Sequence, residues 1–174
     1  MVIKIFMIKN KKLFKNKINF FEAGFSLVEI VIASAIITIS LVCIVQLAGQ
    51  SIVFSRQAVN VYTSASLLEE GAESVRTIRD SGWGNISAFL NSTNYYPVFA
   101  TSTNSWSLTT TTSTVGNFTR IVTFSPVYRD TNYNISTTGT LATSVRFVTV
   151  TVSWKESVGM ITKTLSFYLS DIFS

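Results

Sequence analysis

The chain contains no histidine and a single cysteine, Cys43, among its 174 residues. Histidine is the commonest general base and metal ligand in proteins, so its absence removes the usual starting point for a catalytic or metal site. A single cysteine cannot form an intramolecular disulfide, and the other residues contain no phosphate-binding loop and no nucleophile–base pair. The sequence therefore predicts a protein that is not an enzyme and that carries no cofactor.

Charge is also scarce, and the net charge of +5 comes from one end of the chain. Residues 1–24 contain six Lys and one Glu, whereas residues 25–174 contain eight basic and eight acidic residues. No cluster of Lys or Arg in the second range is available to neutralise phosphates, so direct nucleic-acid binding is not predicted. The basic character describes a leader, which we place at residues 1–24.

A long apolar run follows the leader over residues 25–49 and contains one charged residue, Glu29. Its 25 residues exceed the roughly 20 that a helix needs to cross a bilayer. Lysines precede the run and Arg56 stands alone after it, so the positive-inside bias predicts a single-pass protein with a cytoplasmic N-terminus and its C-terminal part outside. A carboxylate near the membrane interior costs about 2.5–3.5 kcal/mol on insertion scales, so Glu29 is expected to have a partner.

Two interpretations of this segment need no family knowledge. An uncleaved signal anchor explains the lysines and the apolar run but leaves the cost of Glu29 unexplained. A secretory signal cleaved at Ala33-Ser34-Ala35 has a suitable small-residue site, but that site lies in the middle of the run, where a cleavage region should already be polar.

The third interpretation rests on residues 23–29, which read AGFSLVE. This stretch resembles the prepilin peptidase motif of the type IV pilin and type II secretion pseudopilin superfamily. The resemblance implies cleavage after Gly24, methylation of the new amino group of Phe25, and assembly of the remaining helix into a filament. It also implies that Glu29 pairs with the terminal amine of Phe25 on a neighbouring subunit and sets the register of assembly. Glycine suits the cleavage position because its backbone can enter a narrow protease cleft.

The same resemblance implies partners and a location. The partners are a prepilin peptidase, sibling pilin or pseudopilin subunits, and a membrane assembly platform driven by a cytoplasmic ATPase. The subunit would wait in the cytoplasmic membrane and then enter an extracytoplasmic, cell-surface filament. Many major pilins close a C-terminal loop with a disulfide, which this chain cannot form, so a minor pilin or pseudopilin is favoured. Adhesion or motility pili, DNA-uptake pili and secretion pseudopili all remain open, as does a different class, an uncleaved, signal-anchored extracytoplasmic binding module.

Helical periodicity continues beyond the apolar run, over residues 50–82. Apolar residues recur every three or four positions and form one stripe, at Phe54, Ala58, Val61, Ala65, Leu68, Ala72, Val75 and Ile78. We interpret the stripe as the spine of a globular domain, with a coiled-coil seam as the alternative. Glu73 and Arg76 are spaced for an i,i+3 pair, and Asp80-Ser81-Gly82 is a stop signal. A continuous helix over 25–80 would be about 84 Å long.

The C-terminal part, residues 83–174, has the pattern of a β-rich domain. Loops rich in Ser, Thr and Asn come first, and strands are predicted at 95–100, 106–110, 118–130, 143–156 and 160–173. The last two strands are separated by a short turn and should form an antiparallel hairpin. A helix with an apolar stripe beside such strands predicts an α+β fold, in which a long N-terminal helix packs against an antiparallel sheet. This is the architecture that the pilin resemblance also implies.

One loop has a weak metal pattern. Asp130, Asn132 and Asn134 alternate like the start of a calcium loop. An EF-hand loop needs Gly at its sixth position and Glu at its twelfth, where this chain has Ile135 and Leu141. No metal site is therefore predicted, and an Asx-type turn is favoured over calcium binding.

Overall fold

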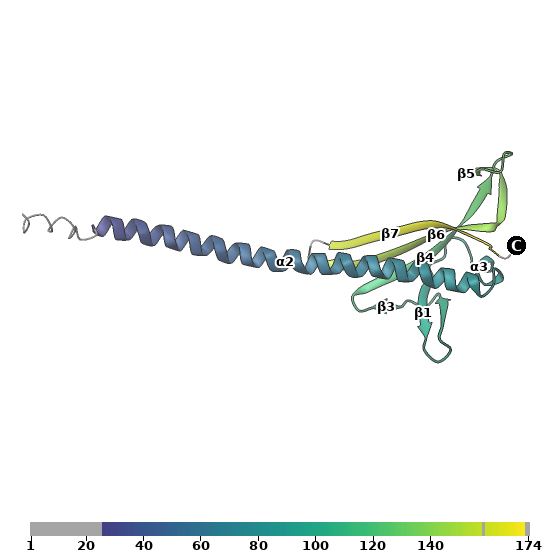
Figure 1. Cartoon of the computed structure of the whole chain (residues 1–174), viewed down its shortest axis with the longest axis horizontal. Coiled ribbons are helices and arrows are strands. Elements are labelled where there is room, and N and C mark those ends of the chain that lie inside the picture. Colours follow the sequence, from purple (N-terminus) through teal and green to yellow (C-terminus); the bar gives the residue numbers. More distant parts are fainter. Residues whose placement is uncertain (1–25, 158, 173–174) are drawn as a thin grey trace, which may run out of the picture. The chain divides into compact units, whose positions relative to one another are not determined.

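The computed structural model describes residues 26–157 and 159–172 and has an α+β fold (Figure 1). Helix α2 (Leu27–Asp80) precedes a C-terminal antiparallel β-sheet, which confirms the predicted fold class. The chain divides into two compact units between Phe54 and Ser55. We call residues 27–54 the apolar segment and the unit that begins at Ser55 the head, and describe each by itself.

The main sheet of the head has the strand order β3–β4–β6–β7, and β5 also pairs with β4. All of these pairs are antiparallel. A separate two-stranded sheet, β1–β2, and the short helix α3 come between α2 and β3. The elements are α3 (Gly84–Ser87), β1 (Tyr96–Ala100), β2 (Ser105–Thr109), β3 (Thr114–Val115), β4 (Phe118–Arg129), β5 (Ile135–Ser136), β6 (Thr140–Glu156) and β7 (Gly159–Ser170).

The strand predictions are confirmed, and alternation along β6 explains how the sheet meets the helix. Val148, Val150, Val152 and Trp154 are buried, whereas the residues between them are only partly covered. Successive side chains of a strand point to opposite faces, so one face of β6 faces the core. The predicted hairpin is present, because β6 pairs with β7 along its length. On the edge strand β7 the predicted apolar face is less covered, and Leu165 is exposed.

Buried side chains also alternate along strand β4, up to a shift in its pairing register with β6. Arg120, Val122 and Phe124 are buried, and the pairing with β6 is interrupted between Pro126 and Tyr128. A proline has no N–H to donate to the ladder and is tolerated at such an irregularity. The strand beyond the shift pairs with both β5 and the first residues of β6.

The core lies between the sheet and the C-terminal part of α2. The larger cluster of buried apolar side chains combines residues of α2, α3, β4, β6 and β7 with Tyr95, which precedes β1: Ala72, Val75, Ile78, Ile86, Tyr95, Val122, Phe124, Val148, Val150 and Leu169. A smaller cluster joins Leu67 to Val152 and Trp154. Full burial of a Val, Leu, Ile or Phe side chain contributes about 1.5–3 kcal/mol, so these contacts hold the helix on the sheet.

The predicted apolar stripe of α2 is right for its second half and wrong for its first. Ala72, Val75 and Ile78 are buried and Leu68 is partly buried, as the spine interpretation requires. Four residues assigned to the same stripe are instead exposed: Phe54, Ala58, Val61 and Ala65.

Close approach of backbones explains the correction. The residues of α2 that meet the sheet include Ser64, Gly71 and Ser74, which are buried despite their small size or polarity. The hydroxyls of Ser64 and Ser74 donate to helix carbonyls of Val61 and Gly71, each at 2.7 Å, so neither of these two buried hydroxyls is left unbonded. A Cβ at position 71 would lie 2.7 Å from Cγ1 of Val150, which shows how near the helix comes. These small residues share the face of contact with Leu67, Val75 and Ile78.

Candidate functional site

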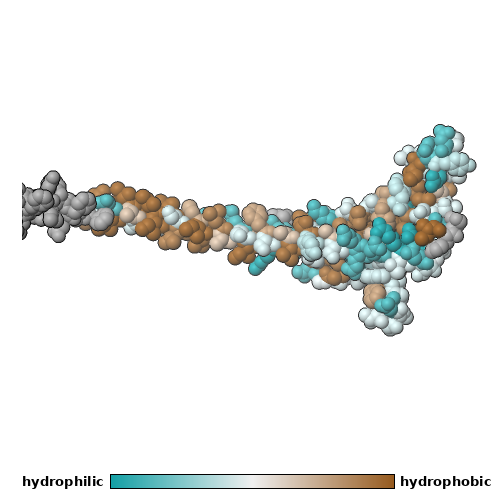
Figure 2. All heavy atoms as spheres, in the orientation of Figure 1, coloured by the Kyte–Doolittle hydropathy of each residue, from teal (hydrophilic) through white to brown (hydrophobic). Residues whose placement is uncertain are grey.

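The apolar segment exposes all of its large apolar side chains. From Leu27 to Phe54 these side chains leave between 50% and 78% of their surface uncovered. Figure 2 shows brown, apolar side chains along this part of α2. Within the described part of the chain, α2 is the helix long and apolar enough to cross a membrane, and it lies near the N-terminus. This finding is compatible with a single-pass membrane anchor.

Hydroxyl groups within the apolar segment are bonded to the helix itself. Ser34, Thr38 and Ser40 donate to carbonyls three or four residues earlier, at 2.9, 2.7 and 2.8 Å. A hydroxyl that bonds its own helix in this way does not need water. In lipid, an unbonded polar group costs several kcal/mol. Because these three hydroxyl groups are already bonded, they are compatible with an apolar environment.

Glu29 lies in the first turn of α2. The carbonyl of Ser26 accepts hydrogen bonds from the backbone N–H groups of Glu29 and Ile30, at 2.8 and 3.2 Å, which makes Ser26 the residue before the first helical turn. An acidic residue at this end interacts favourably with the helix dipole, by about 0.3–1 kcal/mol when exposed. Glu29 is exposed, and among the described residues its carboxylate forms no ion pair.

The Ser26–Glu29 spacing is a second signal, which the sequence analysis overlooked. Ser at the N-cap with Glu three residues later is the capping-box pattern, in which the glutamate accepts from the N-cap backbone N–H. Glu29 therefore has two candidate roles, one in starting α2 and one as a charged partner for another chain. The cleavage and methylation positions, Gly24 and Phe25, lie outside the described residues, so their assignment stays a prediction.

The distance from Glu29 to Phe54 decides where a bilayer can place the carboxylate. No other charged residue lies between them, and 25 steps of about 1.5 Å give a rise of about 38 Å. The hydrocarbon core of a bilayer is about 30 Å thick. A membrane-spanning apolar segment can therefore keep Glu29 at the boundary with the headgroups, where its cost is lower than at the centre.

The Asp130 loop of the head is held by its own hydrogen bonds. Oδ1 of Asp130 accepts from the backbone N–H groups of Asn132 and Asn134, at 2.8 and 2.9 Å. Arg129 donates to the carbonyl of Tyr133, at 2.6 Å. This is the geometry of an Asx turn, in which the carboxylate binds backbone donors. In residues 26–157 and 159–172, no three or more His, Cys, Asp or Glu side chains form a group that could hold a metal.

A buried arginine joins the sheet to the helix. Arg120 of β4 is only 4% exposed, and its Nη1 lies 3.2 Å from Oε2 of Glu70 and 3.5 Å from the carbonyl oxygen of Leu67. Its guanidinium also lies 5.5 Å from the ring centre of Trp106. The sequence showed Arg120 at an inward position of a strand and three glutamates on the helix, but not that these residues meet. The predicted pair of Glu73 with Arg76 is present.

The chemically distinctive parts are the exposed apolar segment with a carboxylate in its first turn and, in the head, the Arg120–Glu70 pair under the helix. Comparison of the chain with protein-family models, curated proteins and solved structures found no match. The functional argument therefore rests on the residues of this chain.

Proposed function

We propose that the chain is a structural subunit of a filament of the type IV pilus or type II secretion pseudopilus kind, processed after Gly24 and assembled through its apolar segment. The observation that carries the proposal is the exposure of every large apolar side chain between Leu27 and Phe54, in a segment that begins within the AGFSLVE stretch. Such a surface has to be covered by lipid or by other helices, because contiguous apolar patches of this size are rare on soluble monomers.

The proposal gives the apolar segment two successive environments. Before cleavage the bilayer covers it, with the leader lysines in the cytoplasm and the head outside. After cleavage, apolar segments of sibling subunits cover one another in the filament core. Prepilin peptidase and a membrane assembly platform act on the chain in between. In the filament core Glu29 has no headgroup boundary to reach, so the new amine of Phe25 on a neighbouring subunit is the partner that offsets its burial.

Two substitutions at Glu29 separate its candidate roles. Glu29→Gln removes the charge and keeps a side chain that serves a capping box, whereas Glu29→Ala removes both. We expect both variants to be cleaved after Gly24 and both to be missing from filaments sheared from cells that express the remaining machinery. Glu69→Ala is the matched control, because Glu69 is an exposed carboxylate of the same helix and lies in the head. We expect it to assemble normally.

The outcomes are distinct. Normal incorporation of Glu29→Gln would show that the charge is not needed and would overturn the assembly mechanism. Loss of incorporation with Glu29→Ala alone would assign Glu29 to the start of the helix. The N-terminal residue of the native protein provides the independent check, since the proposal requires methylated Phe25.

A second candidate is an uncleaved, signal-anchored binding module. The capping-box spacing favours it in one respect, because it explains Glu29 without any filament. This candidate requires a chain that starts at Met1 and keeps its location in the membrane when Glu29 is replaced by Gln or Ala. A start at Ile36 would instead indicate a secreted domain.

A further inference from the structure

The face of the main sheet that points away from α2 is almost uncharged and rich in hydroxyl groups. We call it the outer face; β4, β6 and β7 pair in register across it. Its twelve central residues include nine Ser or Thr and no charged residue: Thr119, Ile121, Thr123, Ser125, Phe147, Thr149, Thr151, Ser153, Thr162, Thr164, Ser166 and Tyr168. Lys155 and Met160 continue the face at the end opposite Tyr168. All are at least partly exposed.

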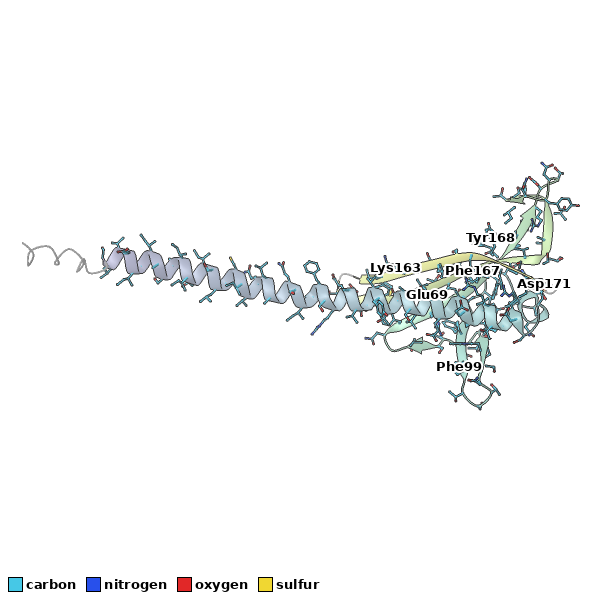
Figure 3. All side chains as sticks on the ribbon, in the orientation of Figure 1. Glu69, Phe99, Lys163, Phe167, Tyr168 and Asp171 are labelled. Atoms are coloured by element: carbon cyan, nitrogen blue, oxygen red, sulfur yellow. The ribbon has the colours of Figure 1, made fainter. Side chains whose placement is uncertain are left out.

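An aromatic cavity lies at one end of the outer face. Its volume is about 260 Å³, and the lining includes Tyr128, Ser136, Phe147 and Tyr168, with no charged residue. The rings of Phe147 and Tyr168 lie 5.0 Å apart at 55°. Tyr168 leaves 52% of its surface uncovered. Figure 3 shows Tyr168 and Phe167 as neighbours on β7, and alternation sends Phe167 to the core side and Tyr168 to the outer face.

The composition of the outer face excludes several classes of partner. Nucleic acid requires a cluster of Lys or Arg to neutralise phosphates, and this face offers only Lys155, at the end opposite Tyr168. The cores of protein interfaces are depleted in Ser, which is frequent here. A lipid surface would need a broad apolar or basic area, and Ile121 is the one aliphatic residue of the twelve. A neutral ligand that combines hydroxyl groups with apolar C–H surface remains.

We propose that the outer face binds a neutral polysaccharide, with one sugar ring against Tyr168 and Phe147 and the following units along the hydroxyl rows. The face of an aromatic ring carries partial negative charge and attracts the polarised C–H groups of a pyranose. Each Ser or Thr hydroxyl donates one hydrogen bond and accepts two, which matches the mixed donors and acceptors of a sugar. Neighbouring strands lie about 4.8 Å apart, so the face offers regularly spaced contacts to an extended chain.

This site does not depend on filament assembly, because all of its residues lie in the head. It would give a filament subunit a surface to bind and would equally serve an anchored module. Its failure leaves the proposed function intact, and failure of the proposed function leaves this site intact.

The experiment measures binding of cellohexaose and chitohexaose to the full chain by isothermal titration calorimetry. The detergent must lack a sugar headgroup, since a glycoside detergent would compete. We expect saturable binding of at least one neutral hexasaccharide and none of hexagalacturonate, which is anionic. Tyr168→Ala and Phe147→Ala should each weaken binding about tenfold, whereas Tyr168→Phe keeps the ring and should bind like the wild type. Tyr133→Ala is the matched control, because Tyr133 is more exposed than Tyr168 and does not line the cavity.

Three results would overturn the proposal. One is the absence of saturable binding for both neutral probes. Another is undiminished binding by Tyr168→Ala and Phe147→Ala, with folding of each verified by tryptophan fluorescence. The third is self-association of the chain that depends on Tyr168 and blocks the probes, which would assign the outer face to a second copy.

Discussion

Replacing Gly71 with alanine tests how closely α2 approaches the sheet. A methyl group at this position would lie 2.7 Å from Cγ1 of Val150 and 3.1 Å from Cδ of Arg120. Carbon atoms in contact prefer a separation of about 3.5–4.0 Å, so the helix or the strand has to move by about 1 Å. Val150 is fully buried on β6, between β4 and β7, and cannot simply rotate into solvent.

The expected magnitude follows from two opposing effects. Overpacking a well-packed core costs about 1–3 kcal/mol. Alanine is favoured over glycine inside a helix by about 1 kcal/mol. We therefore expect Gly71→Ala to lower the free energy of unfolding by about 1 kcal/mol. The same substitution at a helical position with free space around it would raise the free energy of unfolding by about 1 kcal/mol. Val150→Ala should lower it by about 2–3 kcal/mol, through lost burial of two methyl groups and a residual cavity.

The double variant distinguishes a steric clash from a general loss of helix packing. In Gly71→Ala/Val150→Ala the new methyl group enters the space that the valine leaves, so the double variant should be more stable than the sum of the single effects by about 1.5–2 kcal/mol. Urea unfolding followed by tryptophan fluorescence reports on the head alone, because Trp83, Trp106 and Trp154 all lie there. Gly84→Ala is the control, since a Cβ at that position would meet no atom within 4 Å. Additive effects, or a Gly71→Ala variant more stable than the wild type, would refute the close approach.

Three further expectations concern the head. In the same urea assay, Leu67→Ala should lose about 2–4 kcal/mol of unfolding free energy and Val61→Ala less than about 0.5 kcal/mol, because Leu67 is 5% exposed and Val61 is 47% exposed. The reverse order would mean that α2 turns its other face to the sheet. Glu70→Ala should lower the free energy of unfolding by about 1–2 kcal/mol, because it leaves the buried guanidinium of Arg120 without its counter-charge, although Glu70 itself is 45% exposed. Arg120→Met removes the buried charge and should lower the free energy of unfolding by less. A larger loss with Arg120→Met would argue against this account. Asp130→Ala should speed hydrogen exchange at the backbone amides of Asn132 and Asn134, which donate to the Asp130 carboxylate. Calcium should leave the melting temperature of the wild type unchanged. A rise in melting temperature with calcium that Asp130→Ala abolishes would instead identify a calcium site.

The strands were predictable because their signal is local. Val148, Val150, Val152 and Trp154 alternate with Thr and Ser, and alternation of period two places them on one face wherever the sheet lies. The end of α2 at Asp80 was predictable for a similar reason, since Gly82 follows and has a φ of 136°, which side chains with a Cβ rarely adopt.

The orientation of α2 against the sheet was harder to predict, because apolar periodicity marked only part of the face that meets the sheet. The stripe through Phe54 and Val61 is more apolar, but the helix presents Ser64 and Gly71 to the sheet. Whether a small residue marks a close approach depends on the surface opposite it, which lies about 80 residues further along the chain in β6. A separation of 50 positions likewise hid the contact between Arg120 and Glu70. Long-range complementarity of this kind is absent from any local window of sequence.

The first turn of α2 illustrates how one residue can satisfy a local rule and an intermolecular one. Glu29 has the spacing of a capping box with Ser26, and a capping glutamate is worth about as much as any other first-turn acid, under about 1 kcal/mol when exposed. Burial in a bundle of apolar helices without a partner would cost several times more. Capping therefore explains a carboxylate at the membrane boundary but not one in a filament core, where only a cation from another chain balances it. The comparison of Glu29→Gln with Glu29→Ala measures which of these two energies matters, because glutamine keeps the first and removes the second.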